Sequence, residues 1–74
     1  MKKEYLFEGA YIELRGNNDL LLEGCDGILE YEENQISLQV GKQKLSITGR
    51  RLQLRYLSDK RIGISGYIKG VCYV

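Results

Sequence analysis

The sequence contains no histidine, no proline and no tryptophan, and it has only two cysteines, Cys25 and Cys72. Histidine is the usual proton-transfer group near neutral pH and the commonest metal ligand. Without histidine, neither a Ser-His-Asp nor a Cys-His catalytic site can be built. The cysteines are too few and too far apart for a metal or redox motif. We therefore expect a protein that is not an enzyme and that binds neither a metal nor a cofactor.

Long apolar runs and a signal peptide are also absent from the sequence. No run approaches the roughly 20 apolar residues of a membrane span, and acidic residues interrupt the start of the chain. These features predict a cytoplasmic protein without a transmembrane segment, in which both cysteines are small buried residues. A disulfide or a reactive thiol is the alternative for the cysteines. A chain of 74 residues has a thin core, so we also expect a homo-oligomer or a stabilising partner.

Charge is present but unevenly distributed. Residues 1–33 carry nine acids and three bases, a balance of −6, whereas residues 34–74 carry eight bases and one acid, a balance of +7. Such halves indicate either an interaction surface or charges that pair with each other across the fold. Both interpretations stay open at this point.

Apolar and polar residues alternate with a period of two from residue 11 onward, which is typical of half-buried strands. The pattern assigns these residues to the core: Ile12, Leu14, Ile36, Leu38, Val40, Leu45, Ile47, Leu52, Leu54, Tyr56, Ile62 and Ile64. Polar turns are predicted at 16–19, 32–35, 41–42 and 58–60. We expect an all-β domain over residues 11–74, a small sandwich or roll of about seven or eight short, mostly antiparallel strands. Residues 1–10 form an N-terminal arm, a short helix or an added strand.

Three segments repeat one pattern: "LLLEGCDGILEY", "LSITGRRLQLRY" and "IGISGYIKGVCY". They align on Gly24, Gly49 and Gly66, with aliphatic residues two and four positions before each glycine and a tyrosine seven positions after it. The even and odd offsets would lie on opposite faces of an uninterrupted strand. A glycine bend or bulge would return both sets to the core. We therefore expect irregular backbone at or just after these three structural glycines, with the tyrosines on the core side.

Two surfaces are candidates for partner binding. One is a basic strand face, and the other is the C-terminal strand, whose two faces are both apolar and which could form an open edge. The candidate residues are Lys42, Lys44, Arg51, Arg55, Val71 and Tyr73. Nucleic-acid binding would require aromatic side chains interleaved with the basic residues of this face, and we expect Tyr56 to point inward instead. The basic face is therefore interpreted as a site for an acidic protein or membrane surface, or as a solvated strand face.

The chain carries Leu45, Ile47, Gly49, Leu52 and Leu54, followed by Ile64, Gly66 and Ile68. This spacing resembles the pattern "L-x-I-x-G-x-x-L-x-I" and then "I-x-G-x-I" of the YabP/YqfC family of sporulation proteins. The segment "EGCDGILEY" is similar to the YqfC branch, and the resemblance covers residues 11–74. It implies a small non-enzymatic protein of endospore-forming bacteria that acts in the mother cell with a membrane-protein partner of the YqfD type. No catalytic residues are implied.

Three functions follow as hypotheses. The first is a sporulation-associated binding or scaffolding module that docks on a protein partner, by strand addition at an open edge. The second is a self-assembling structural building block of the developing spore. The third and weakest is a nucleic-acid-binding domain.

Overall fold

The computed structural model describes the backbone of residues 2–7 and 10–73 and the side chains of residues 10–73. The described residues form strands, turns and connections, and no helix. Six strands have described side chains and a further strand, β1, is described by its backbone. The strands are β1 (Lys2–Phe7), β2 (Ala10–Arg15), β3 (Asp19–Glu23), β4 (Gly27–Tyr31), β5 (Gln35–Val40), β6 (Gln43–Ser58) and β7 (Arg61–Tyr73).

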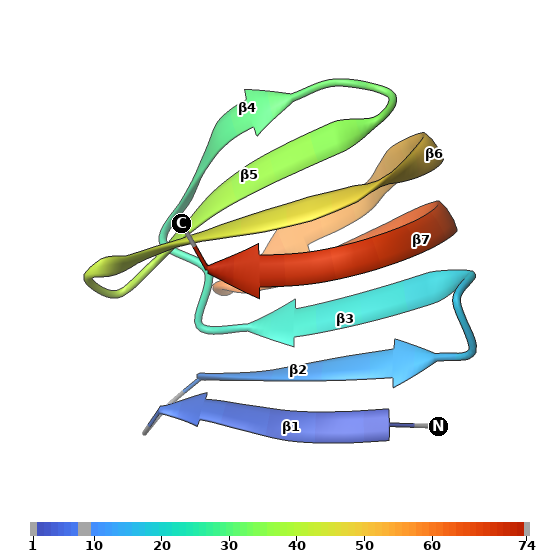
Figure 1. Cartoon of the computed structure of the whole chain (residues 1–74). Coiled ribbons are helices and arrows are strands. Elements are labelled where there is room, and N and C mark those ends of the chain that lie inside the picture. The colour runs from blue at the N-terminus through green and yellow to red at the C-terminus, as the bar shows by residue number, and fades with distance from the viewer. Residues whose placement is uncertain (1, 8–9, 74) are drawn as a thin grey trace.

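All strands belong to one open antiparallel sheet, in the order β1-β2-β3-β7-β6-β5-β4 (Figure 1). The all-β, antiparallel prediction is confirmed. The sandwich alternative is wrong, because a sandwich needs two separate sheets. The expectation of uniformly short strands is also wrong, since β6 has 16 residues and β7 has 13. Each of these strands is long enough to pair with different neighbours along its length.

The long β6–β7 hairpin joins two halves of the sheet. Its turn-proximal half pairs β7 with β3, over Arg61–Ser65, and its distal half pairs β6 with β5, over Gln43–Thr48. The molecule measures 29 × 26 × 23 Å. A flat sheet is a single layer, and even stacked sheets lie only roughly 10 Å apart. A flat sheet would therefore be much thinner than the shortest dimension of this molecule. The near-equal dimensions therefore show that the sheet curls, as the hairpin in Figure 1 also shows.

The core lies between the two halves of the curled sheet. Its buried apolar members are Ala10, Ile12, Leu20, Leu22, Cys25, Ile36, Leu38, Val40, Leu45, Ile47, Leu52, Ile62, Ile64 and Ile68. Leu14 and Leu54 are partly buried against this cluster. The period-two assignment of the core is thus confirmed except at Tyr56. That side chain is 49% exposed and lies over the backbone of Gly63, where a β-carbon would be 2.8 Å from its Cζ atom.

The hairpin bends where two glycines bring β6 and β7 into close approach. The pairing register shifts between Thr48 and Gly49 and again between Arg50 and Gln53. A β-carbon at Gly49 would clash with the carbonyl oxygen of Tyr67. Gly66 has a φ of +129° and would clash with the Arg50–Arg51 backbone if it carried a β-carbon. Only glycine satisfies both requirements, so these positions determine where the sheet curls.

Gly24 lies at a different kind of irregularity. It has a φ of +96° and belongs to the connection between β3 and β4, where the chain passes from one half of the sheet to the other. The tyrosines that follow the three glycines do not return to the core. Tyr31, Tyr56 and Tyr73 are each about half exposed, so that part of the repeat interpretation is wrong. The bends bring Leu54 and Val71, five positions after their glycines, against the core, but they do not bring the tyrosines inside.

The β2–β3 turn closes one corner of the curled sheet. The backbone N–H of Gly66 donates to the carbonyl oxygen of Asn18 at 3.1 Å, and the N–H of Ile68 donates to that of Asn17 at 2.8 Å. The predicted turn at 16–19 is confirmed. It supplies acceptors for a stretch of β7 that has just left its pairing with β3.

Candidate functional site

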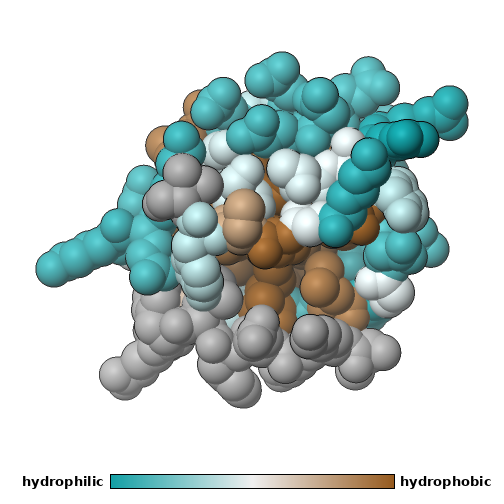
Figure 2. All heavy atoms as spheres, in the orientation of Figure 1, coloured by the Kyte–Doolittle hydropathy of each residue, from teal (hydrophilic) through white to brown (hydrophobic). Residues whose placement is uncertain are grey.

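An apolar groove lies between β2 and the C-terminal half of β7. It has a volume of about 260 Å³, below the roughly 300–1,000 Å³ of typical small-molecule sites. The groove is therefore suited to a few side chains of a protein segment and not to a cofactor. Apolar residues gather at the centre of this face, with hydrophilic residues above them (Figure 2). The lining residues are Ile12, Leu14, Gly16, Asn17, Leu45, Ile68, Lys69, Gly70, Val71, Cys72 and Tyr73.

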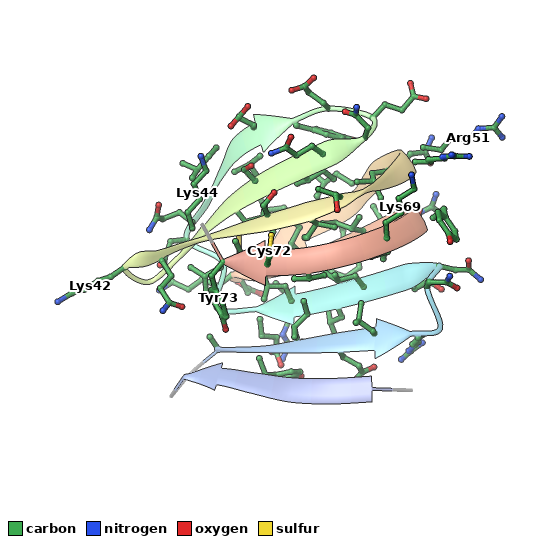
Figure 3. The ribbon with its side chains drawn as sticks, in the orientation of Figure 1. Lys42, Lys44, Arg51, Lys69, Cys72 and Tyr73 are labelled. Atoms are coloured by element: carbon green, nitrogen blue, oxygen red, sulfur yellow. The ribbon has the colours of Figure 1, made fainter. Side chains whose placement is uncertain are left out.

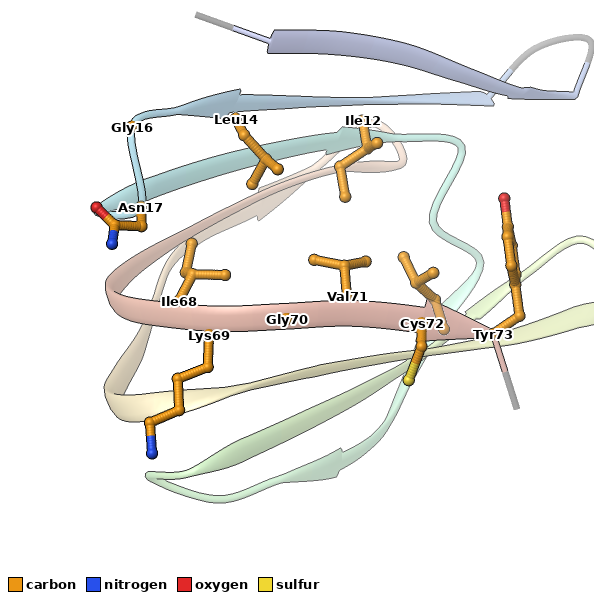
Figure 4. A pocket seen from close by; sticks show the side chains of 11 residues that line it. Ile12, Leu14, Gly16, Asn17, Ile68, Lys69, Gly70, Val71, Cys72 and Tyr73 are labelled. Carbon is orange, nitrogen blue, oxygen red and sulfur yellow. The ribbon is translucent and has the colours of Figure 1, made fainter.

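The two walls of the groove come from facing strands. Ile12 and Leu14 point from β2 toward β7, and Ile68 and Val71 point back toward them (Figure 4). Leu14 and Val71 are only partly buried, so apolar surface remains open to a ligand. Tyr73 stands at one end of the groove and is 51% exposed. The walls diverge because β7 turns away from β3 after Ser65, the last residue that pairs with β3.

This part of β7 is also an open sheet edge. From Tyr67 to Tyr73 the strand pairs with β6 on one side, and none of the described strands pairs with it on the other. In an antiparallel strand, alternate residues direct their N–H and C=O groups to opposite sides. Beyond the Ile68–Asn17 bond, every second residue therefore offers backbone groups to the open side. Such an edge is a template for another strand.

Positive charge surrounds the edge on the face opposite the groove. Lys69 and Cys72 point away from the groove (Figure 4). A shallow hollow beside Lys69 is lined by Arg50, Arg51, Gly66 and Tyr67, and Arg51 and Lys69 lie at the same end of the hairpin in Figure 3. Strands β5, β6 and β7 contain no acidic residue. Among the described side chains, none forms an ion pair with Arg50, Arg51 or Lys69.

The structure brings together only some of the candidate residues. Val71 and Tyr73 line the same groove. Lys42 lies in the β5–β6 turn, at the opposite end of the hairpin from Arg51 (Figure 3), and the Lys44 ammonium pairs with Glu30 at 3.7 Å.

Arg51 and Arg55 do not share one flat basic face with these lysines. Arg51 has a φ of +53° and sits at the bend, whereas Arg55 lines a hollow on the outer face of β2, β3 and β7 that also contains Glu13 and Asp19. The expectation of one continuous basic face is wrong, because register shifts interrupt the alternation between Arg50 and Gln53 and between Leu54 and Tyr56.

Sequence reasoning missed Lys69, Arg50 and the β2 wall of the groove. Lys69 is the one base in the otherwise apolar segment "YIKGVCY", and Gly49–Ile68 and Thr48–Gly70 are successive partners, so Lys69 is the extra residue of a bulge. A lone base beside a glycine in an apolar strand could have signalled that bulge. The β2 wall had no comparable signal, because its pairing across space depends on how the sheet curls.

Away from Arg50, Arg51 and Lys69, the acidic and basic halves of the chain form ion pairs with each other. Of the four ion pairs among described side chains, three join residues 1–33 to residues 34–74: Lys44–Glu30, Lys60–Asp26 and Arg61–Glu23. The Arg61 Nε lies 2.6 Å from Glu23 Oε1. A hydrogen bond to Glu23 raises the pKa of Tyr11. The charge asymmetry is therefore partly compensated within the fold, and the Arg50–Lys69 region is an uncompensated part of it.

Both cysteines are free. Cys25 is 3% exposed, and burial raises the pKa of its thiol, so the expectation of a buried, unreactive cysteine holds there. It is wrong for Cys72, which is exposed at the edge strand. The prediction that Tyr56 points inward is also wrong, since Tyr56 is 49% exposed, and Tyr67 beside the basic cluster is 48% exposed. That premise no longer argues against nucleic acid.

Comparison with known proteins identifies the family of this chain. Within the part of the chain that the structure describes, no helix has the length and apolar character to cross a membrane. The search of curated proteins gives no match. The profile of the YabP family matches residues 8–74, which includes the bent hairpin, the groove and the open edge. The chain belongs to the YabP family.

Proposed function

We propose that the protein is a non-enzymatic docking module of sporulation, which binds a protein partner at the open edge of β7. The observation that carries this proposal is the edge of β7 beyond the Ile68–Asn17 bond, with which no second described strand pairs, beside an apolar groove of about 260 Å³. An edge supplies backbone hydrogen bonds and a groove supplies side-chain specificity, which together are the requirements for strand addition. The absence of histidine supports a role without catalysis.

Membership of the YabP family indicates a sporulation-related protein. The segment Glu23–Tyr31 resembles the YqfC branch, and on that basis we place the protein in the mother-cell cytoplasm with a membrane-protein partner of the YqfD type. The partner would supply the membrane attachment.

The test is capture of the partner from sporulating cells by the tagged protein. The wild-type chain should retain one membrane protein, and Val71→Asp should lose it, because a carboxylate in the groove is costly to bury. Lys42→Glu, at the distant β5–β6 turn, is the control and should still capture it. Circular dichroism must show that both variants fold. Equal capture by Val71→Asp would contradict docking at this edge.

A self-assembling building block is the second candidate, because the same edge could receive a second copy of the chain. Sedimentation at increasing concentration separates the two functions. A docking module should stay one small species alone, whereas a building block should grow with concentration. If opposite charges drive the growth, salt should suppress it. Nucleic-acid binding ranks below both, since Glu32 and Glu33 share a hollow with Arg50 and Arg51 and would repel a phosphate backbone.

A further inference from the structure

We infer that the β7 edge receives an extended protein segment in which apolar residues alternate with acidic ones. This inference rests on the proposed docking function and names the chemistry of the partner at that site. It follows from the different character of the two faces of β7 beside the free edge. One face opens into the apolar groove, and the other carries unpaired bases.

The inward face selects apolar side chains. A strand added beside β7 would direct alternate side chains to the groove side of the sheet, where Ile12 and Leu14 form the opposite wall (Figure 4). None of the residues that line the groove is acidic, and Lys69 points out of it. The small volume of about 260 Å³ limits the occupants to a few side chains.

The outward face selects carboxylates. The remaining side chains of the added strand would lie on the same face as Lys69, next to the hollow that contains Arg50 and Arg51. Opposite charges on neighbouring strands stabilise a sheet, and like charges destabilise it. Glu32 and Glu33 lie in a hollow with Arg50 and Arg51, but the hollow beside Lys69 contains no acidic residue. Strands β5, β6 and β7 carry none either, so a carboxylate that pairs with Lys69 would come from the partner.

The same argument disfavours pairing of β7 with the β7 edge of a second copy. The free part of that strand carries Lys69 and no acidic residue. An edge-to-edge pair of two β7 strands would bring the basic side chains of both copies together, with no acidic side chain on either strand to pair with them. A partner segment with acidic residues satisfies both faces at once.

Two synthetic peptides test the inference directly. One alternates Val with Glu over seven residues, and the other alternates Val with Lys. Fluorescence polarisation should show binding of the Glu peptide, weakened by salt, and much weaker binding of the Lys peptide. Backbone amide resonances of residues 68–73 should shift on binding, and those of β4, at the far edge of the sheet, should not.

A charge exchange gives the matched control. Lys69→Glu should weaken the Glu peptide about fivefold, the upper range for one exposed ion pair, and should strengthen the Lys peptide. Lys42→Glu makes the same charge change at a residue that lines neither the groove nor the hollow beside Lys69, and it should leave both affinities unchanged. Lys69 is exposed, so its replacement should not impair folding.

The outcomes separate this inference from the proposed function. If the chain captures its partner in a Val71-dependent way but binds both peptides equally, the acidic-apolar chemistry is wrong and docking at the edge stands. If peptides bind and no partner is captured, the inference stands and the docking function fails. Shifts at residues 68–73 that depend on protein concentration instead of peptide would show that a second copy occupies the edge, and would overturn the inference.

Discussion

At the scale of single residues, the shape of the molecule depends on two backbone approaches in the β6–β7 hairpin. Gly49 passes against the carbonyl oxygen of Tyr67, and Gly66 passes against the backbone of Arg50 and Arg51. Any side chain at these positions would push the two strands apart. Since the groove exists because β7 diverges after the bend, these glycines also determine whether the docking edge is open.

Gly49→Ala should lower the free energy of unfolding by about 1–3 kcal/mol, the usual cost of forcing an extra group into packed structure. Urea denaturation measures the effect. Gly27→Ala is the control, because a β-carbon at Gly27 would have no atom within 4 Å, and it should change stability by less than about 1 kcal/mol. Equal stability of Gly49→Ala and the wild type would contradict the proposed close approach.

At the scale of elements, two hairpin turns, β2–β3 and β4–β5, supply hydrogen-bond acceptors to the β6–β7 hairpin at its bend. The β4–β5 turn mirrors the β2–β3 turn. The backbone carbonyl oxygen of Asn34 accepts from the Gly49 N–H at 3.1 Å, and that of Glu33 accepts from the Leu52 N–H at 2.7 Å. Tyr31 at the end of β4 continues this series, because its hydroxyl oxygen accepts from the Leu54 N–H at 2.8 Å. These contacts satisfy part of the open edge of β6.

Tyr31→Phe should therefore speed amide hydrogen exchange at Leu54 and reduce stability by about 0.5–1.5 kcal/mol, the net contribution of one hydrogen bond. The control is Tyr56→Phe, which removes the hydroxyl of a tyrosine of similar exposure that forms no hydrogen bond among the described side chains. Exchange measured by NMR should respond at Leu54 in the first variant only. Unchanged protection of Leu54 would show that the Tyr31 hydroxyl contributes nothing to that edge.

At the scale of the whole molecule, the β3–β4 connection holds the two halves of the sheet together. Asp26 accepts a hydrogen bond from the Gly41 N–H at 2.8 Å and lies 3.4 Å from the Lys60 ammonium. One side chain thus links the turns of two hairpins. The hydrogen bond from the Gly41 N–H, and next a hydrogen bond from the Lys60 ammonium, lower the pKa of Asp26 below its ordinary value of 3.8.

The direction of this shift predicts a pH dependence. A carboxylate with a depressed pKa in the folded state contributes stability above its unfolded pKa, and the contribution is lost as the pH falls through the folded value. Asp26→Asn should therefore be less stable than the wild type at pH 7, and the difference should shrink below about pH 4. Thermal unfolding at pH 3, 5 and 7 measures both. A difference that stays constant across this range would exclude a role for the Asp26 charge.

The sequence alone determined the all-β class, the four turns, most of the core and the family. These features depend on local alternation and turn chemistry, which short stretches such as Ile36–Val40 contain in full. The glycine repeat led to wrong assignments for Tyr31, Tyr56 and Tyr73, because it predicts bends that return these side chains to the core, whereas they remain about half exposed.

Only the tertiary structure decided that one sheet curls on itself and leaves the second half of β7 with a free edge. That outcome depends on contacts between residues distant in sequence, such as Gly49 with Tyr67 and Asn17 with Ile68. The groove follows from the same contacts, because Ile12 and Val71 become neighbours only after the sheet bends. The separation of Arg51 from Arg55 also depends on tertiary pairing, since register shifts between Arg50 and Gln53 and between Leu54 and Tyr56 rotate side chains that strict alternation would place on one face.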